Sequence, residues 1–388
     1  MKILHEAFSY FRFLELVDSK KEIIFYAEDE ESYFHFKGII NYLTQNLKFP
    51  VVYITSKIND KIFDKESELF KVFYFDKLLP IIIKNLKSKV IIMTMPDLDV
   101  FHIKRSKHCN NHIYIFHNIG SSFTAIRFGA LFNYDTLFCV GEHHEIETKK
   151  QENYYKLKNK NLVKFGYNKL ELIIEQYKDY NYKKNSNGKR ILIAPSWGEN
   201  SILNYCGKEL IDNLLNNDYV LIVRPHPMTF KKHNHVILEL LEHYNNSNNF
   251  SIEQDISSTD SFYNADLLIT DWSGVAYEYA FGTEKPILFI DVPQKLVNDK
   301  FEEINLEPID IKIRYKLGEV VSPHELNKID FHINKLINQR DKYISKIIEA
   351  RNSLVYNLGN SSQVGAEYIQ SLILLNLQIP YFLYNIQN

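Results

Sequence analysis

Cysteine and long apolar runs are scarce in this sequence of 388 residues. The three cysteines, Cys109, Cys139 and Cys206, are odd in number, scattered, and form no CxxC pair. This pattern argues against a disulfide framework or a zinc knuckle and favours a reducing, cytoplasmic location. No stretch approaches the ~18 consecutive apolar residues that span a bilayer, and Glu6 and Arg12 interrupt any signal-peptide core. We therefore expect a soluble or peripheral protein.

An excess of charge of one sign is also missing. Lys plus Arg is 46 and Asp plus Glu is 48, which gives a formal net charge of −2. This balance disfavours nucleic acid as the main partner. Apolar residues at 45% and charged residues at 24% are typical of a globular protein, and the length predicts two domains, with three as the alternative. The 26 Tyr and 26 Phe are explained by aromatic cores, with a surface near lipid headgroups as the alternative.

Short β-branched or aromatic runs alternate with helical patterns along the chain. The predicted strands of the first half are 23–27, 51–55, 71–75, 90–94, 112–117, 136–141 and 161–166. Those of the second half are 190–196, 219–224, 250–254, 267–270 and 286–291, followed by a long helix over 325–349. This alternation predicts an α/β protein with two doubly wound parallel sheets. The polar break at 178–190 is interpreted as the linker between them.

In open parallel sheets, ligands bind beyond the carboxyl ends of the strands. The sequence YVLIVRPHPMT ends a predicted strand in Arg224-Pro225-His226-Pro227. Two prolines fix the backbone on each side of His226, and a rigid histidine at a strand end can contact a phosphate or move a proton near neutral pH. The alternative is a structural histidine in a stiff turn.

A second strand end lies in ADLLITDWSGVAYEYAFGTEKPILFID. The strand runs into Asp271, and a helix is predicted to begin near Ser273 or Gly274, which makes an anion site of backbone N–H groups and the Ser273 hydroxyl. Glu278 lies one turn into that helix, where it is placed to face a ribose or sugar hydroxyl. The alternative is that Asp271 or Ser273 only caps the helix. The Ser196-Trp197-Gly198 turn also ends a strand.

Two further segments carry polar residues at turns. IYIFHNIGSSFT ends a first-half strand in His117, and YNLGNSSQVGAEY places Ser361 and Ser362 at the start of a last helix. His143 and Glu147 have the i,i+4 spacing of metal ligands, but no further ligand set is visible, so we expect a solvated helix start and no metal site. The chain has no GxxxxGK[ST], GxGxxG or GxSxG motif, which disfavours kinase-type, simple dinucleotide-binding and serine-hydrolase functions.

Together, the strand-end His117, RPHP, the TDWSGVAYEYAFGTEKPILFID segment and LGNSSQ resemble the CDP-glycerol glycerophosphotransferase family, the polymerases and primases of teichoic acids and related capsular polymers of the cell envelope. The resemblance is strongest over 191–291 and moderate over 113–144. It implies a GT-B fold, in which two Rossmann-like domains face a central cleft. The expected domains are 1–180 for the acceptor, 190–350 for the nucleotide donor, and a helical segment, 351–388, that crosses back to the first domain.

The resemblance also implies an activity and a site. The family transfers a polyol phosphate from CDP-glycerol or CDP-ribitol to an acceptor hydroxyl on a glycan or polyprenyl-linked chain and releases CMP. His117 and His226 are then the catalytic residues, with His117 as the candidate base, although this chain has Phe116-His117-Asn118 where the family often has Trp-His-Gly. The residues expected to bind the donor and its phosphates are Arg224, Asp271, Ser273, Gly274, Glu278, Ser361 and Ser362.

A phosphoryl transfer of this kind needs an in-line nucleophile and stabilisation of charge on the phosphate oxygens. Since CMP leaves as an ionised phosphate, we predict no obligatory metal or other cofactor. Two alternatives stay open: a GT-B glycosyltransferase or nucleotide-sugar epimerase that uses an NDP-sugar, and a non-catalytic subunit of a polysaccharide-assembly complex. The apolar tail at 368–384 is expected to pack on the first domain, with contact to the inner face of the cell membrane as the alternative.

Overall fold

The computed structural model describes residues 2–180, 188–255 and 258–384, with the side chains of 375–384 left aside. Most of the linker predicted at 178–190 lies outside the described residues. The chain forms two compact units, of which the first comprises Met1–His117, Ile126–Asn168 and Val355–Asn388 and the second Asn118–Ala125 and Lys169–Leu354.

The first unit is built on a seven-stranded parallel sheet in the order β3-β2-β1-β4-β5-β6-β7. Its strands are β1 (Ile23–Ala27), β2 (Val51–Thr55), β3 (Phe70–Tyr74), β4 (Ser88–Met93), β5 (Cys109–Ile115), β6 (Thr136–Cys139) and β7 (Asn161–Lys164). Every residue of β1 and β2 is buried, because helices cover both faces of a parallel sheet. Continuous runs of Val, Ile and aromatic residues therefore form its centre.

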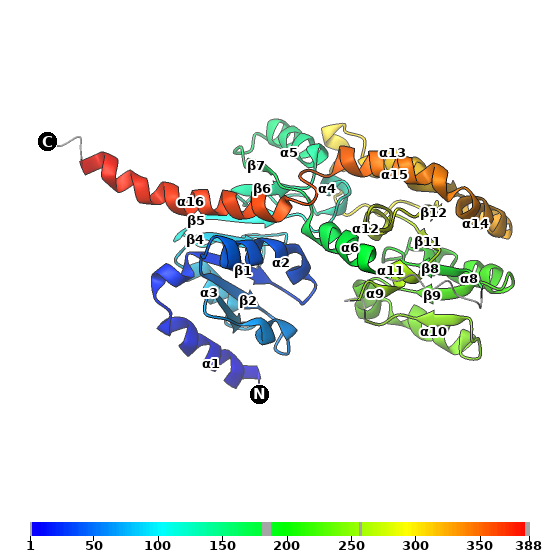
Figure 1. Ribbon diagram of the computed structural model, residues 1–388, viewed down its shortest axis with the longest axis horizontal. Helices are drawn as coiled ribbons and strands as arrows, with labels where there is room; N and C mark the ends of the chain where they lie inside the picture. Colours follow the sequence, from blue (N-terminus) through cyan, green and yellow to red (C-terminus); the bar gives the residue numbers. More distant parts are fainter. Residues whose placement is uncertain (1, 181–187, 256–257, 385–388) are drawn as a thin grey trace. The chain divides into compact units, whose positions relative to one another are not determined.

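Helices from both ends of the chain cover this sheet. They are α1 (Lys2–Glu15), α2 (Ser32–Asn41), α3 (Leu79–Asn85), α5 (Glu142–Tyr155) and α16 (Ser361–Tyr384). Figure 1 shows α16 running along the sheet beside α2, and Ile369 and Ile373 join Phe25 and Phe36 in one buried core.

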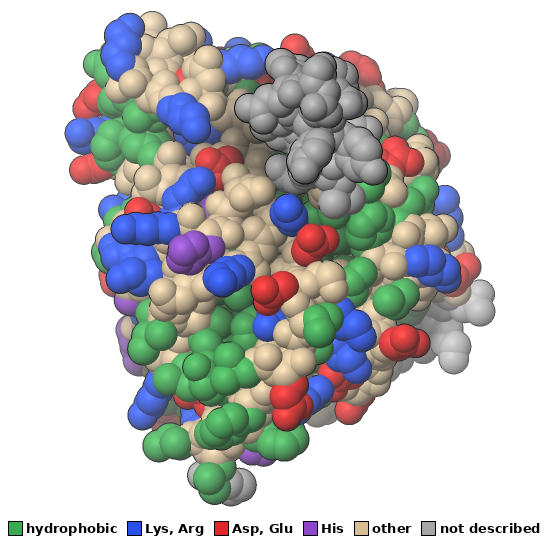
Figure 2. Space-filling view, turned by 90° about the vertical axis from the view of Figure 1, so that its left-hand side faces the viewer, with side chains coloured by type: hydrophobic (Ala, Val, Ile, Leu, Met, Phe, Trp, Pro, Cys, Tyr) green, Lys and Arg blue, Asp and Glu red, His purple; other side chains and the backbone are tan. Residues whose placement is uncertain are grey.

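Helix α1 is amphipathic, but its polar side faces the sheet and its apolar side faces outward. Its sheet-facing side is largely polar, because Glu6 and Ser9 are buried there together with Phe13. Its outer side is apolar: Leu4 is 74% exposed and Phe11 is 65% exposed. Figure 2 shows hydrophobic side chains gathered at the lower end of the face on which α1 lies. No helix of the described residues is long and apolar enough to cross a membrane.

The second unit is built on a six-stranded parallel sheet in the order β10-β9-β8-β11-β12-β13. Its strands are β8 (Arg190–Ile193), β9 (Val220–Val223), β10 (Phe250–Ile252), β11 (Leu267–Thr270), β12 (Ile287–Ile290) and β13 (Gly318–Val321). Its helices are α4 (Ser122–Ala125), α6 (Asn168–Asp179, of which Asn168 belongs to the first unit), α7 (Ile202–Tyr205), α8 (Gly207–Leu215), α9 (Pro227–Lys232), α10 (Asn234–Tyr244), α11 (Asp260–Asn264), α12 (Val275–Thr283), α13 (Ile309–Leu317), α14 (Ile329–Asn338) and α15 (Arg340–Leu354). A separate buried core lies between β8, β9 and β11 and helices α8, α10 and α14.

The predicted α/β architecture with two parallel sheets is confirmed. The long helix predicted over 325–349 is wrong in detail, because the chain forms a 3₁₀ segment (Pro323–Lys328) followed by α14 and α15. The residue between the two helices, Gln339, caps α14 with non-helical backbone angles.

Candidate active site

His117 lies beyond the carboxyl end of β5, an interior strand of the first sheet, and is exposed. Its Nδ1 lies 3.1 Å from the hydroxyl of Tyr114, and its backbone carbonyl accepts a hydrogen bond of 2.9 Å from the Tyr167 hydroxyl. Burial raises the pKa of Tyr114, so this phenol stays protonated at neutral pH. When Nδ1–H donates to the phenol oxygen, Nε2 carries the lone pair and can accept a proton.

His226 follows β9 and is the N-cap of α9. Its Nδ1 accepts a hydrogen bond of 3.1 Å from the backbone N–H of Met228. The neutral ring therefore carries its proton on Nε2 and presents a hydrogen-bond donor there. Pro227, at the first helical position, supplies a fixed φ and needs no backbone donor. A donor with a fixed tautomer suits contact with a phosphate oxygen.

Arg224 ends the same strand and is tied to the loop after β10. Its Nη1 contacts Glu253 at 3.1 Å and donates to the carbonyl of Ser258 at 2.7 Å and to the hydroxyl of Ser261 at 3.1 Å. Its guanidinium also lies 5.0 Å from the ring centroid of Phe262. Arg224 thus links the end of β9 to the segment that follows β10.

Asp271 ends β11 and is 1% exposed. Its two oxygens accept backbone N–H groups of Ser196 at 2.7 Å and Ile202 at 3.1 Å. Burial raises the pKa of this carboxyl, while those hydrogen bonds act in the opposite direction. Asp271 therefore fixes the loop that carries Trp197.

Ser273 and Gly274 lead into α12, for which Gly274 is the N-cap, and both are partly accessible. A Cβ on Gly274 would lie 2.5 Å from Oδ1 of Asn118, so only glycine fits without displacement. One turn later, the buried Glu278 forms an ion pair of 2.9 Å with Lys169.

Ser361 and Ser362 begin α16 in the first unit. Both hydroxyls hydrogen-bond the side-chain amide of Asn168, and Ser361 is fully buried. A Cβ on Gly38 of α2 would overlap the Ser362 hydroxyl, so α2 and α16 approach closely here.

The second unit brings five predicted residues to one edge of its sheet, since the carboxyl ends of parallel strands share an edge. Arg224 and His226 follow β9, while Asp271, Ser273 and Gly274 follow β11, with β8 between these strands. Glu278 lies further along α12. His117, Ser361 and Ser362 belong to the first unit.

Sequence reasoning missed Tyr114 and Asp310. The carboxylate of Asp310, at the start of α13, accepts from the Ser121 backbone N–H at 2.9 Å and from the Tyr277 hydroxyl at 2.7 Å. This ties the segment Asn118–Ala125 to α12 and α13. No local signal marks either residue, because Tyr114 meets His117 only through the bend after β5 and Asp310 is 189 residues from Ser121.

The first turn of α5 is buried, contrary to the expected solvated helix start. His143, His144 and Glu147 are each less than 10% exposed, and the ring of His144 stacks on Phe116 at 3.8 Å. Among the described residues, no group of three His, Cys, Asp or Glu side chains has the arrangement of a metal site.

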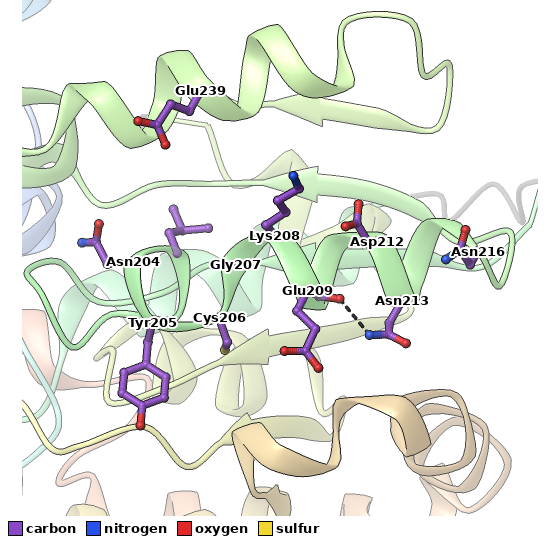
Figure 3. Close-up of a pocket in the computed structure, with 11 residues that line it drawn as sticks. Asn204, Tyr205, Cys206, Gly207, Lys208, Glu209, Asp212, Asn213, Asn216 and Glu239 are labelled. Atoms are coloured by element: carbon purple, nitrogen blue, oxygen red, sulfur yellow. Dashed lines mark hydrogen bonds between the residues drawn. The ribbon is translucent and has the colours of Figure 1, made fainter.

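A polar hollow of about 570 Å³ lies beside α7 and α8. Figure 3 shows the residues that line it. Lys208, Glu209, Asp212 and Glu239 line it, and none of the predicted site residues does. The candidate site therefore rests on the strand ends and not on this hollow.

Comparison with solved structures assigns both units to the GT-B class of α/β proteins, as predicted. The wall teichoic acid polymerase TagF, from a crystal soaked with CDPG, superposes with a TM-score of 0.59 at 15% identity over 96% of this chain and 94% of that chain. A putative UDP-N-acetylglucosamine 2-epimerase from Listeria monocytogenes gives a TM-score of 0.58 at 11% identity, covering 90% of this chain and 96% of that one. S. aureus MnaA, in a structure with UDP, gives 0.56 at 14% identity, covering 94% and 97%.

Within that class, residues 131–295 match the family described as CDP-Glycerol:Poly(glycerophosphate) glycerophosphotransferase. The resemblance predicted from the sequence is thereby confirmed. Among curated proteins, the minor teichoic acid biosynthesis protein GgaB of Bacillus subtilis (strain 168) is 23% identical over 270 residues, or 57% of this chain. The chain spans 28% of the length of GgaB.

Proposed function

We propose that this protein is an enzyme that transfers a polyol phosphate, glycerol phosphate first among the candidates, from a CDP-activated donor to a hydroxyl of a surface-glycan or lipid-linked acceptor, with release of CMP. The family match over residues 131–295, which includes both RPHP and the segment from Asp271 to Glu278, carries this proposal. The strand-end histidines support it.

In the proposed step, the acceptor oxygen attacks the glycerol-bearing phosphorus of the donor. The new P–O bond forms as the bond to the bridging oxygen breaks, and CMP leaves with the bonding electron pair. The acceptor proton passes to Nε2 of His117, whose Nδ1 is held by the Tyr114 hydroxyl. His117 therefore acts as the general base.

Charge on the phosphate oxygens is stabilised from the second unit in this proposal. His226 donates from Nε2, because its Nδ1 accepts from Met228. Ser273 and the helix start at Gly274 supply further donors, and Arg224, which is paired with Glu253, positions this edge for the donor. Asp271 supports this edge through its bonds to Ser196 and Ile202. Glu278 is proposed to face the donor's ribose or polyol and Ser362 to bind phosphate, whereas the fully buried Ser361 holds the start of α16 against Asn168.

The test is a panel of CDP-glycerol, CDP-ribitol and UDP-N-acetylglucosamine, read by the nucleotide released with a glycerol-phosphate oligomer as acceptor. We expect CMP from a CDP-linked donor. His226→Ala should lower turnover by at least ~10², and His117→Ala should abolish transfer while donor affinity is retained. His243→Ala, which removes an exposed histidine of α10, is the control. Since the proposed donors of charge are side chains and a helix start, treatment with EDTA should leave turnover unchanged.

Two outcomes would contradict this function and indicate a different one. Release of UDP, or epimerisation of the UDP-sugar, would make the protein an NDP-sugar enzyme. Donor binding with no turnover in any arm would make it a non-catalytic subunit.

We also propose that the protein works in the cytoplasm at the inner face of the cell membrane, with the outer side of α1 against lipid. Ile3, Leu4, Phe8, Phe11 and Leu14 form this apolar face, and each is at least 55% exposed. A solvated helix normally turns its apolar side inward, so an outward apolar face fits an interfacial helix.

The opposite side of α1 is fixed by hydrogen bonds. A Glu6 carboxylate oxygen accepts the backbone N–H groups of Asp76 and Leu78, each at 2.7 Å. Lys77 lies between these two residues, and Lys77 and Lys2 are both exposed. These cations favour anionic headgroups as the partner of the apolar face.

Vesicles that contain phosphatidylglycerol test this contact. We expect Phe8→Gln/Phe11→Gln to lose cosedimentation, while CMP release with a water-soluble acceptor is retained. Phe331→Gln is the matched control, because Phe331 is 64% exposed on α14. Unchanged cosedimentation of the double variant would contradict the lipid contact, as would a finding that the wild type self-associates through this face in the absence of vesicles.

A further inference from the structure

Trp197 is surrounded by basic side chains at the carboxyl edge of the second sheet. The Nζ of Lys295 lies 3.4 Å from the centroid of the Trp197 ring, and the Nζ of Lys232 lies 5.0 Å from the same centroid. The ring of His226 is 6.2 Å away. These groups come from loops or helices that follow three strands, β8, β9 and β12. The turn at Trp197 is recognisable in the sequence as a strand end, whereas neither lysine is.

The loop that carries Lys295 is anchored on both sides. The indole N–H of Trp272 donates to the carbonyl of Val292 at 2.8 Å. Beyond Lys295, the Val297 N–H donates to the Thr124 carbonyl at 2.9 Å, and the Asn298 amide donates to the Phe123 carbonyl at 2.8 Å. Lys295 is therefore held over Trp197 by a preformed loop.

The lysines of this cluster form no ion pair with an acidic side chain of the described residues. In the described part of the chain, no carboxylate lies within ion-pairing distance of Lys232 or Lys295. The nearby Asp271 already binds the backbone N–H groups of Ser196 and Ile202. Burial lowers the pKa of Lys295 to about 8; Asp271 opposes this shift and Lys232 adds to it. Two ammonium groups beside one ring repel each other until an anion binds.

We propose that Lys295 and Lys232, together with the Nε2 donor of His226, form a phosphate-binding site beside Trp197. The choice of phosphate as the anion rests on the proposed function, whereas an anion as the ligand is inferred from the two lysines beside Trp197. The phosphate belongs either to the diphosphate of the donor or to a phosphodiester of the acceptor chain, and both present the same oxyanions. Lysine serves such a site as a compact point charge.

Calorimetric titration with inorganic pyrophosphate tests the site without requiring catalysis. We expect Lys295→Gln and Lys232→Gln each to weaken binding about tenfold or more, as loss of a charge-assisted contact does. Lys231→Gln removes the same charge from the adjacent position of α9 and should change affinity less than twofold. Lys295→Arg should retain most of the affinity, and thermal unfolding of each variant shows whether it is folded.

The pH dependence of this binding provides a second readout. Because only the ammonium form attracts phosphate, pyrophosphate affinity should fall as the pH rises through about 8. This fall should be smaller in Lys295→Gln. Wild-type affinity in both Gln variants would overturn the proposal.

Two further titrants identify the source of the phosphate. If the Lys→Gln variants lose affinity for CDP only, the site binds the donor. If they lose affinity for a glycerol-phosphate oligomer only, the site binds the acceptor. Either result supports the site. If no donor releases CMP but Lys295→Gln still binds pyrophosphate more weakly than wild type, the proposed function is wrong and the anion site is supported.

Discussion

At the scale of single residues, the edge of the second sheet is held by polar atoms that already have protein partners. Asp271 accepts two backbone N–H groups, and Nδ1 of His226 accepts another. These bonds fix the Nε2–H tautomer of the neutral His226 ring and give Asp271 a supporting role beneath the loop of Trp197. The position of Gly274 is equally constrained, by contact with Asn118.

Gly274→Ala should destabilise this edge. The backbone at Gly274 (φ −60°, ψ −18°) suits alanine, so the cost is steric and comes from a Cβ 2.5 Å from Asn118 Oδ1. We expect a loss of about 1–3 kcal/mol in the free energy of unfolding, together with weaker donor binding.

Asn118→Ala serves as the companion variant, since it removes the obstructing amide and also its bond to the Gly120 N–H. The double variant should be more stable than the sum of the two single effects by at least ~0.5 kcal/mol in urea unfolding. Strict additivity would show that the contact with Asn118 does not decide the need for glycine.

At the scale of elements, Lys285 ties α12 to α11. Lys285 follows the left-handed C-cap Glu284 and is 1% exposed. Its ammonium donates to the carbonyls of Tyr263 at 2.9 Å and Ala265 at 2.6 Å, at the C-terminal end of α11. A cation is favourable at the negative end of a helix dipole, yet burial lowers the pKa of Lys285 to about 7.

This depressed pKa predicts a pH dependence of stability. Between about pH 7 and the usual lysine pKa near 10.5, the unfolded chain binds more protons at Lys285 than the folded chain does, so the free energy of unfolding rises with pH. Lys285→Met should flatten this rise and lower the stability overall, because two carbonyls lose their donor. Urea unfolding at pH 7, 8 and 9 measures the slope, with the exposed Lys342→Met as control. An equal slope in wild type and Lys285→Met would contradict this assignment.

Most strands were predictable from the sequence and β13 was not, for physical reasons. β11 coincides with the predicted 267–270, because a buried parallel strand is a continuous apolar run bounded by polar residues. β13 was missed, since Gly318 and Glu319 carry little strand signal and are paired only by contact with β12. Within the candidate site, the strand-end histidines could be recognised from local sequence, whereas Lys295 could not, because its meeting with Trp197 depends on a loop 98 residues away along the chain.

At the scale of the whole molecule, the first unit is completed by the last segment of the chain. Val355–Asn388 belongs to it, although almost 190 residues of the second unit lie between Asn168 and Val355 in the sequence. Ala366, Ile369 and Ile373 of α16 enter the same core as β1, and Tyr368 contacts Phe138 of β6. The sheet that carries His117 therefore depends on contacts formed late along the chain, whereas the second unit has a core of its own.

Ile369→Ala should consequently weaken the first unit selectively. Ile369 is fully buried, and truncation leaves a cavity between α16 and the first sheet, which costs about 2–5 kcal/mol. Amide hydrogen exchange should accelerate in β1 and β4 and stay near its wild-type rate in β8 and β11, because local stability follows the core that each strand shares. Glu367→Ala, at an exposed position of the same helix, controls for changes in helix propensity. Equal acceleration in both sheets would mean that the two cores unfold as one cooperative unit, and an unchanged rate in β1 would mean that α16 contributes little to the sheet on which His117 stands.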